Sequence, residues 1–243
     1  MSVPSLQVCL NGARSKAEHP NVPHTPAELA RDVEALFAAG ARAFHLHVYR
    51  EGRQTLEPGA VADALRAIRA ACPDAELAVS TAEGIAPTPA ERAHLISGWT
   101  VWPDVLCVNL SEEGIDDVLA LAGGRGAVLE AGLAVPADVQ KFRALGPLHW
   151  RRVLLEPLSP EPAAAEQELR ALLDALGDFR PDLPRLAHGM DGAAWPLLRR
   201  AARLGLNSRI GFEDVLTLPA GERPAGTLDL YRAGLRLMEV EHD

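Results

Sequence analysis

Short apolar runs alternate with longer segments of helical period along the whole chain. In eight places, a run with strand character is followed by a segment whose apolar residues recur at helical spacing. The expected strands are Leu6–Leu10, Ala43–Val48, Leu77–Ser80, Val105–Asn109, Ala127–Leu129, Arg152–Leu155, Arg185–Ala187 and Ser208–Gly211. Eight such pairs in 243 residues give about 30 residues per pair, the usual size of one βα unit. The pattern therefore predicts a (β/α)8 TIM barrel formed by residues 1–243 as a single domain, with an open doubly wound sheet as the alternative.

Two of the expected helices begin with the same four residues. Thr25–Glu28 and Thr88–Glu91 both read Thr-Pro-Ala-Glu, which is a capping box with proline at the first helical position. After the first box, an apolar face is formed by Leu29, Val33, Leu36 and Phe37. Further helices are expected at Val61–Ala71, Ala163–Leu176, Ala193–Leu204 and Leu228–Leu237. We expect these helices to bury their apolar faces against the barrel.

The composition is that of a folded, acidic protein. Hydrophobic residues make up 48% and charged residues 23% of the chain, and the formal net charge is −9. This balance excludes disorder, and an acidic chain lacks the basic surface that binds nucleic acid. No stretch approaches the roughly 18 apolar residues of a membrane span, and the first residues lack a signal-peptide pattern. We therefore expect a cytoplasmic protein with no nucleic-acid or membrane partner.

The cysteines and most of the histidines carry no recognisable motif. The three cysteines are widely separated, which argues against a disulfide framework and against any CxxC site. Cys9 and Cys107 are expected to be small buried hydrophobes in strands.

The chain also has no glycine-rich phosphate loop, which argues against NAD and ATP as cofactors. Five histidines are expected at the surface: His19, His24, His94, His149 and His242.

Polar residues stand at or just after the carboxyl end of every expected strand. In a parallel barrel these ends converge on one mouth, where catalytic groups lie. In chain order the residues are Asn11, His45, His47, Ser80, Thr81, Asn109, Glu130, Glu156, His188, Arg209, Glu213 and Asp214. Ser80 and Thr81 suit hydrogen bonding to a substrate carboxylate, although residues of these types also cap helices. The mouth of the barrel is therefore the expected active site.

His45 and His47 are the clearest signal for a metal. Side chains alternate along a strand, so both imidazoles face the same side and form half of a divalent-metal site. Two polar residues on a half-exposed strand would show the same spacing, but two unpaired histidines inside a barrel would be costly to bury. Of Glu213 and Asp214, one can bind the metal while the other pairs with Arg209 and acts as a base. Acids placed at a helix N-terminus are the alternative explanation of this pair.

Several motifs of the chain occur together in one known family. They are Asn11-Gly12-Ala13, Pro20–Pro23, Thr25–Glu28, Ala39–Arg42 followed by His45–Val48, Ser80-Thr81 and Arg209–Asp214. In this combination the chain resembles the β-keto acid cleavage enzymes, whose type activity is 3-keto-5-aminohexanoate cleavage. The resemblance is dense over the first half of the chain and around residues 185–215, and thin between 110 and 180.

The resemblance implies a zinc-dependent (β/α)8 barrel that condenses a β-keto acid with acetyl-CoA, giving acetoacetate and a new acyl-CoA. It implies that His45, His47 and Glu213 hold Zn²⁺ or another divalent ion, which would stabilise the enolate of the keto acid. Asp214, paired with Arg209, would handle the proton on the carbon between the two carbonyls. The same resemblance implies a homodimer or homotetramer.

Further residues are expected to take part in this site. Ser80 would assist the proton transfer. Five residues are expected to contact the substrate: Thr81, Asn109, Glu130, Asn11 and Arg14. Arg14 stands where the type enzyme has an acid, so a substrate with an anionic or neutral tail is expected in place of an amino-substituted one.

Two other functions are alternatives. Members of the family have a glycine-rich stretch after the sixth strand, where the resemblance implies that CoA binds, whereas here Leu155–Pro160 contains no glycine. This difference favours, as the runner-up, a metal-dependent aldolase, lyase or hydrolase of the same fold that uses no CoA. A third hypothesis is a barrel without catalysis that acts as a binding or scaffold protein and holds no metal.

Overall fold

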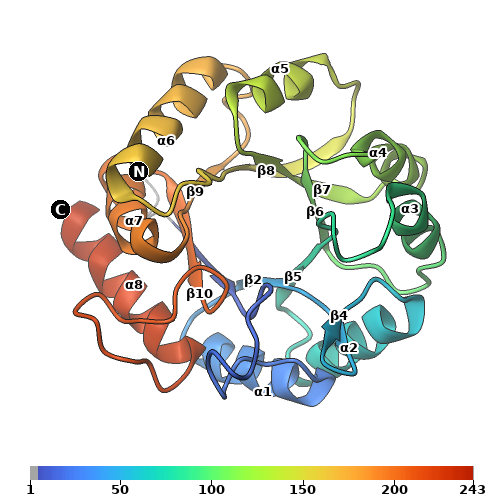
Figure 1. The fold of residues 1–243 in the computed structure, drawn as a ribbon, viewed down its shortest axis with the longest axis horizontal. Coiled ribbons are helices and arrows are strands. Elements are labelled where there is room, and N and C mark those ends of the chain that lie inside the picture. The colour runs from blue at the N-terminus through green and yellow to red at the C-terminus, as the bar shows by residue number, and fades with distance from the viewer. Residues whose placement is uncertain (1–4, 243) are drawn as a thin grey trace.

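Eight parallel strands form a closed barrel in the computed structural model, which describes residues 5–242 (Figure 1). The barrel strands are β1 (Leu6–Cys9), β2 (Ala43–Leu46), β5 (Glu76–Ser80), β6 (Val105–Asn109), β7 (Val128–Leu133), β8 (His149–Leu155), β9 (Arg185–Ala187) and β10 (Asn207–Gly211). Around the barrel they follow the order β1-β10-β9-β8-β7-β6-β5-β2, and β1 pairs with β2 to close it. The predicted (β/α)8 barrel is confirmed, and the open sheet is excluded.

A ring of helices surrounds the strands (Figure 1). The helices are α1 (Pro26–Ala38), α2 (Pro58–Ala71), α3 (Pro89–Ser97), α4 (Ile115–Gly124), α5 (Pro136–Ala144), α6 (Pro162–Leu176), α7 (Ala194–Arg203) and α8 (Thr227–His242). The capping box that begins α1 is complete, whereas at Thr88 only the bond from the Glu91 amide to the threonine hydroxyl forms. No helix of residues 5–242 is both long and apolar enough to cross a membrane.

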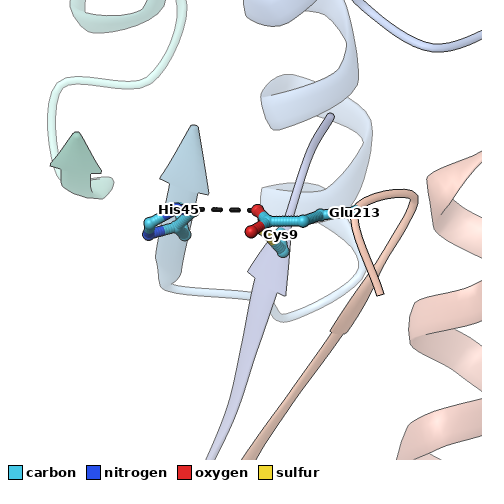
Figure 2. Close-up of side chains that lie close together, drawn as sticks. All are labelled: Cys9, His45 and Glu213. Carbon is cyan, nitrogen blue, oxygen red and sulfur yellow. Dashed lines mark hydrogen bonds and ion pairs between the residues drawn. The ribbon is translucent and has the colours of Figure 1, made fainter. Parts of the chain in front are cut away.

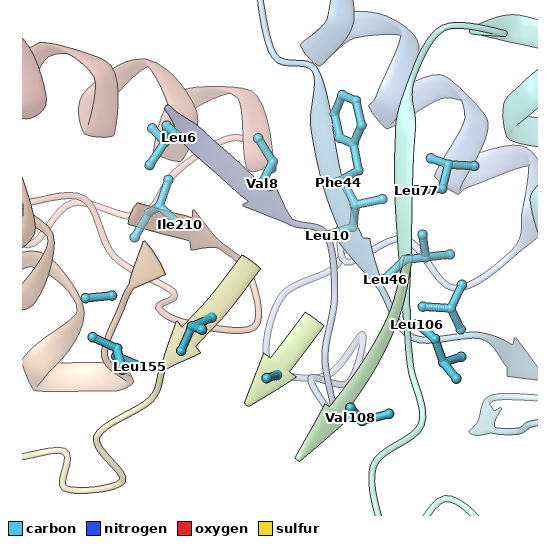
Figure 3. Packing of buried hydrophobic residues seen from close by; sticks show 14 of the residues in the cluster. Leu6, Val8, Leu10, Phe44, Leu46, Leu77, Leu106, Val108, Leu155 and Ile210 are labelled. Carbon is cyan, nitrogen blue, oxygen red and sulfur yellow. The ribbon is translucent and has the colours of Figure 1, made fainter. Parts of the chain in front are cut away.

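Alternate residues of the barrel strands point outward and pack against the helices. Val8, Phe44 and Ile210 are fully buried (Figure 3). They belong to one continuous apolar cluster with helix residues such as Leu36 and Leu65. We call this cluster the outer layer. Each Å² of apolar surface removed from water contributes about 25 cal/mol to the free energy of folding. A layer of this kind is therefore the main source of stability in such a fold.

The intervening residues point into the barrel, and many of them are polar. Gln7 and Cys9 alternate with the outward residues of β1, as His45 does on β2 and Arg209 on β10. Lateral pairing places Gln7 beside Arg209, and Cys9 beside both His45 and Gly211. We call the space enclosed by these residues the barrel interior. Its separate apolar cluster contains only Cys107, Leu154 and Leu186 among the residues that the structure describes.

Three expected strands have limits that are wrong by more than one residue, and a bulge explains two of them. β7 begins one residue later than expected and continues four residues beyond Leu129, and β8 begins at His149 instead of Arg152. Between these strands Leu129 pairs with Trp150 but Glu130 with Arg152, so one residue of β8 is skipped. A bulge breaks the simple alternation on which the sequence prediction depends. The third error is at β2, which ends at Leu46, so His47 follows the strand.

A short hairpin interrupts the first half of the chain and was not predicted. β3 (Tyr49–Arg50) and β4 (Arg53–Gln54) pair in an antiparallel manner outside the barrel order. The two residues between them, Glu51 and Gly52, have φ angles of 52° and 76°. Positive φ at both central residues is typical of a two-residue hairpin turn, and a glycine at the second of them could have signalled it.

Candidate functional site

The carboxyl ends of β1, β2 and β10 bring a cysteine, a pair of histidines and two acids together. Figure 2 shows Cys9, His45 and Glu213 pointing toward one another from these three elements. The Nε2 atoms of His45 and His47 each lie 3.6 Å from the same oxygen, Oε2 of Glu213. Both imidazoles are nearly inaccessible to solvent. The structure thus brings His45, His47 and Glu213 to one place, at the mouth of the barrel.

Glycine at position 12 leaves the space that the Glu213 side chain fills. A Cβ atom on Gly12 would collide with the Cβ and Cγ atoms of Glu213, and the φ angle of Gly12 is +57°. Both features disfavour any other residue there. The Asn-Gly pair after β1 therefore has a steric role toward the acid that follows β10.

Two amide side chains fix the position of His47. Its Nδ1 atom lies 2.7 Å from Oε1 of Gln54, a residue of the β3–β4 hairpin. Asn11 accepts a hydrogen bond from the His47 backbone N–H and donates one to the His47 carbonyl, both at 2.9 Å. Asn11 also donates to the carbonyl of Pro23, so its amide binds backbone groups on both sides. Hydrogen bonds of this kind orient histidines that bind metals. Sequence reasoning missed Gln54 because it missed the hairpin.

The donor atoms fit a divalent metal ion. Two imidazoles and a carboxylate are a ligand set of catalytic zinc sites. Ligand atoms at about 2.0–2.2 Å from an ion in tetrahedral geometry lie roughly 3.4 Å from one another. This value is close to the 3.6 Å between Glu213 Oε2 and each imidazole nitrogen. Among the described residues, the groups whose ligand atoms all lie within 4.8 Å of one another are Cys9, His45 and Glu213, and His45, Cys107 and Glu130. His47 joins the first group through its contact with Glu213, so the residues at this place could hold a metal.

Burial and charge set the protonation of these groups. Burial lowers the pKa of His45 well below its usual value, so its imidazole is neutral and has a free electron pair. Burial alone would raise the pKa of Glu213, but the positive charge of Arg209 and then that of His47 outweigh it and hold that pKa well below the usual range. Burial opposes the charge on His47 too, but the carboxylate of Glu213 raises the pKa of His47, so a metal would take the place of a proton at this imidazole. Neutral imidazole and ionised carboxylate are the forms that bind metals.

Arg209 and Asp214 form a buried ion pair beside these three residues. Nε and Nη2 of Arg209 donate to Oδ1 of Asp214 at 3.1 and 2.7 Å, and Nη2 also lies 3.3 Å from Glu213 Oε1. Burial would lower the pKa of Arg209, but the nearby carboxylates, Asp214 first, raise it well above its usual value. The other oxygen of Asp214, Oδ2, has no hydrogen-bond partner within residues 5–242.

His188 lies between Asp214 and Glu156 and is completely buried. Its Nδ1 atom is 3.3 Å from Asp214 Oδ1, and its Nε2 atom is 3.7 Å from Glu156 Oε1. The sequence places His188 and Glu156 among the polar residues at strand ends but assigns neither of them a role. The predicted barrel makes β8, β9 and β10 neighbours, but the order of the strands does not show that these three side chains reach one another.

The residues after β5 and β6 lie at the same mouth. Ser80 is the last residue of β5, and its hydroxyl accepts a hydrogen bond from the amide of Ala82 at 3.3 Å. The Thr81 hydroxyl donates to the carbonyl of Cys107 at 2.7 Å. Asn109 donates to Glu112, while its Oδ1 atom has no partner among the described residues. Among these three side chains, the Oδ1 atom of Asn109 is thus an acceptor that could receive a hydrogen bond from a substrate.

Glu130 and Arg14 are bound to other protein groups. Glu130 is fully buried in the barrel interior, three residues before β7 ends, and accepts hydrogen bonds from Arg152 and from Gln7. Arg152 pairs with Glu76 as well. Arg14, in the loop after β1, pairs with Asp191, and its pKa is raised: burial opposes the charge, but the bonds to Asp191 and Glu18 outweigh it.

Two histidines expected at the surface are buried instead. His19 is 2% and His24 is 9% exposed. The Nε2 atom of His19 lies 2.9 Å from the carbonyl of Pro224, and that of His24 lies 2.9 Å from the carbonyl of Arg14. His24 also stacks on Tyr49 with 3.8 Å between ring centroids. The expectation failed because the loop after β1 packs against the segment that follows β10, with His19 4.4 Å from Phe212 between ring centroids, instead of extending into solvent.

Comparison with known proteins points to one family. The sequence model described as "BKACE: beta-keto acid cleavage enzyme" matches residues 5–240. The 3-keto-5-aminohexanoate cleavage enzymes of Fusobacterium nucleatum subsp. nucleatum and Acetoanaerobium sticklandii are each 39% identical to this chain over 89 residues. The match covers 36% of this chain and 33% of each enzyme. The chain thus matches about a third of the length of these curated relatives.

Solved structures of ObcA share the fold. The apo structure of ObcA has a TM-score of 0.69 and 17% sequence identity, and the match covers 90% of this chain and 62% of ObcA. The ternary complex of ObcA with a C4-CoA adduct and oxalate has a TM-score of 0.68 and 16% identity, covering 91% of this chain and 64% of ObcA. At this level of identity the likeness concerns the barrel.

Proposed function

The chain belongs to the beta-keto acid cleavage enzyme family, and from this premise we propose that it is a metal-dependent enzyme that cleaves β-keto acids. The reaction converts a β-keto acid and acetyl-CoA into acetoacetate and a new acyl-CoA. The observation that carries the proposal is the convergence of His45, His47 and Glu213 beside the buried Arg209–Asp214 pair.

His45, His47 and Glu213 would hold the ion, with zinc as the metal that their ligand types favour. When bound, the ion would supply Lewis-acid stabilisation of the negative charge that develops on the keto acid. Gln54 and Asn11 hold His47 in place for this task. Gly12 leaves the space for Glu213, which we assign as the carboxylate ligand.

Asp214 is the group that we assign to the proton on the carbon between the two carbonyls. Its Oδ1 atom accepts two hydrogen bonds from Arg209, which orient the carboxylate, and its Oδ2 atom is without a partner in the described part of the chain. General-base catalysis needs such an ionised, positioned oxygen. Ser80 assists from the end of β5.

Substrate contacts are proposed on the same side of the barrel. Asn109 offers its Oδ1 atom, and Thr81 and Asn11 are the other polar residues that we assign to the substrate. Arg14 would receive an anionic tail by exchanging Asp191 for the substrate. Glu130 is proposed to contact the substrate from the barrel interior, where hydrogen bonds from Arg152 and Gln7 hold its carboxylate in place.

The activity test is incubation of the purified chain with zinc and a series of β-keto acids, with and without acetyl-CoA. The proposal expects acetoacetate only when acetyl-CoA is present, and faster turnover for acids with anionic tails. Cleavage without acetyl-CoA would contradict the proposal and support the runner-up, a CoA-independent lyase or hydrolase. The proline-rich, glycine-free segment between β8 and α6 is the feature that favours this alternative. No cleavage under either condition would contradict both.

The metal centre is tested by zinc analysis of His45→Ala. We expect the variant to lose bound zinc, whereas His149→Ala, which changes an exposed histidine at the start of β8, keeps it. Equal zinc in His45→Ala and in the unaltered chain would remove His45 from the ligand set.

A further inference from the structure

Cys9 differs from the other two cysteines in what surrounds it. Cys72 belongs to the outer layer and Cys107 to the small apolar cluster of the barrel interior, whereas Cys9 belongs to neither. All three are free and buried. The sequence predicts Cys9 to be a small buried hydrophobe, and the structure confirms its burial but places it among polar groups.

The Cys9 thiol lies against the groups that could hold a metal. Its Sγ atom donates a hydrogen bond to Oε2 of Glu213, the same oxygen that faces His45 and His47. One ligand atom each from Cys9, His45 and Glu213 lie within 4.8 Å of one another. Figure 2 shows the three side chains meeting at one point.

The backbone holds Cys9 in this position. In the barrel ladder Cys9 is paired with Gly211 on one side and with His45 on the other. A side chain at position 211 would collide with the carbonyl of Cys9, so the glycine permits the close approach of β1 and β10. The thiol therefore projects from a rigid strand, which places its sulfur more precisely than a loop would.

We infer that the sulfur of Cys9 is a fourth protein ligand of the metal ion held by His45, His47 and Glu213. The inference rests on the metal centre of the proposed function. On metal binding the S–H bond breaks, the proton leaves to solvent and the sulfur electron pair forms the bond to the metal, with no change of oxidation state. A thiolate is a soft ligand, so it favours zinc and cobalt over magnesium and manganese.

This ligand has a consequence for the resting site. Four protein ligands complete a tetrahedral zinc site, whereas catalytic sites keep one position open. A keto acid that chelates the metal must therefore displace one protein ligand or raise the coordination number to five. Cys9 would be the ligand added to the usual set of two histidines and a carboxylate, so its sulfur is the ligand that we expect the keto acid to displace.

Cobalt titration of the metal-stripped full chain tests the inference. Bands in the visible region report a bound tetrahedral cobalt ion, and a thiolate-to-cobalt charge-transfer band in the near ultraviolet reports sulfur ligation. We expect both in the unaltered chain. In Cys9→Ser and Cys9→Ala the visible bands should persist while the charge-transfer band disappears, and Co²⁺ affinity should fall about 10- to 100-fold, by analogy with the loss of groups supporting a metal site.

Matched controls separate Cys9 from the other thiols. Cys72→Ser, in the outer layer, and Cys107→Ser, which has its own grouping with His45 and Glu130, should both keep the charge-transfer band. Serine can keep the hydrogen bond to Glu213, so unchanged Co²⁺ affinity in Cys9→Ser would reduce Cys9 to a hydrogen-bond donor and overturn the inference.

The remaining outcomes are also decisive. Visible bands without a charge-transfer band in the unaltered chain would overturn the inference and leave the metal centre of the proposed function intact. No cobalt binding at all would overturn the metal centre itself. Should the Cys9 variants not fold, X-ray absorption of the zinc-loaded unaltered chain answers the same question, since a sulfur scatterer at about 2.3 Å is expected and its absence would contradict the proposal.

Discussion

On the outer face of the barrel strands, Val8 and Phe44 pack with helix residues in one apolar layer, whereas the inner face carries groups such as Gln7, His45 and Arg209. The same strands supply both faces, because side chains alternate along each strand. Stability is therefore concentrated on one face and chemistry on the other. Substitutions on the two faces should differ in kind, and the following experiments test that difference.

The largest expected effect is that of Asp214→Asn on catalysis. Loss of a general base lowers kcat by about 10²- to 10⁴-fold, while the fold should persist, because asparagine can still accept the hydrogen bonds from Arg209. Kinetics of acetoacetate formation and urea unfolding measure the two effects. Asp182→Asn, at an exposed acid paired with Arg180, is the control and should alter neither. A kcat within tenfold of the unaltered chain would remove Asp214 from the role of base.

Arg152→Met should show how the barrel interior responds to an unpaired charge. It leaves the fully buried Glu130 without its partner, and breaking a buried ion pair costs about 3–5 kcal/mol of unfolding free energy. The double variant Arg152→Met/Glu130→Leu should recover most of this loss, because no unpaired charge stays in the barrel interior. Urea unfolding of the two variants is the measurement. A double variant less stable than the single one would show that the pair itself stabilises the fold.

Leu65→Ala makes the corresponding change in the outer layer. Leu65 is fully buried on α2, and such a truncation costs about 2–5 kcal/mol through lost apolar contact and the cavity left behind. Zinc content and kcat of the folded fraction should be unchanged. Unfolding curves, metal analysis and kinetics check this. Loss of zinc without loss of stability would contradict the separation of the two faces.

Asp32 provides a pH-dependent test on the helix ring. Burial raises the pKa of Asp32 from 3.8 to about 6, although Thr227 donates a hydrogen bond to it at 2.7 Å. The folded state thus holds this proton more tightly than the unfolded state, so stability is lost as pH rises from about 4 to 6. The stability of Asp32→Asn relative to the unaltered chain should increase over that range by about 1–3 kcal/mol, since one pKa unit corresponds to about 1.4 kcal/mol. A difference independent of pH would contradict the raised pKa.

Thr25→Ala should have the smallest effect. The hydroxyl of Thr25 accepts a hydrogen bond from the Glu28 amide in the capping box of α1, and such a cap contributes about 1 kcal/mol. Thr25→Ser keeps the bond and should be close to the unaltered chain. Thermal unfolding measures both. Metal binding should be unchanged in each variant, because the cap acts only on the helix ring.

The outer face made the fold predictable from the sequence. Apolar residues at period two on strands and at helical period on α1 leave a pattern that local reading detects, and Thr25-Pro26 marks where a helix begins. The prediction failed where that pattern is broken. The bulge at Glu130 shifted the limits of β7 and β8, and the hairpin at Tyr49–Gln54 contains too few apolar residues to be noticed.

The candidate site was predictable only in part, because its contacts join distant segments. His45 and His47 could be recognised, since one strand carries both. The predicted barrel already makes the last strand a neighbour of the first and of the seventh, but the contacts of His188 with Asp214 and of Cys9 with Glu213 depend on how the side chains after β10 are directed, which the order of the strands does not give. In the sequence Cys9 looks like any other buried cysteine, because nothing local shows that the Glu213 side chain lies against it.

The pairing of β1 with β10 also has a consequence for how the protein is made. Cys9 and Glu213 are 204 positions apart, and the strands that carry them join the two ends of the sheet into a ring. During synthesis the histidines leave the ribosome long before the acid does, so the complete ligand set exists only after the last strand has closed the ring. An ion bound there would stabilise the pairing of β1 with β10, and it would favour the closed barrel over every partly folded chain.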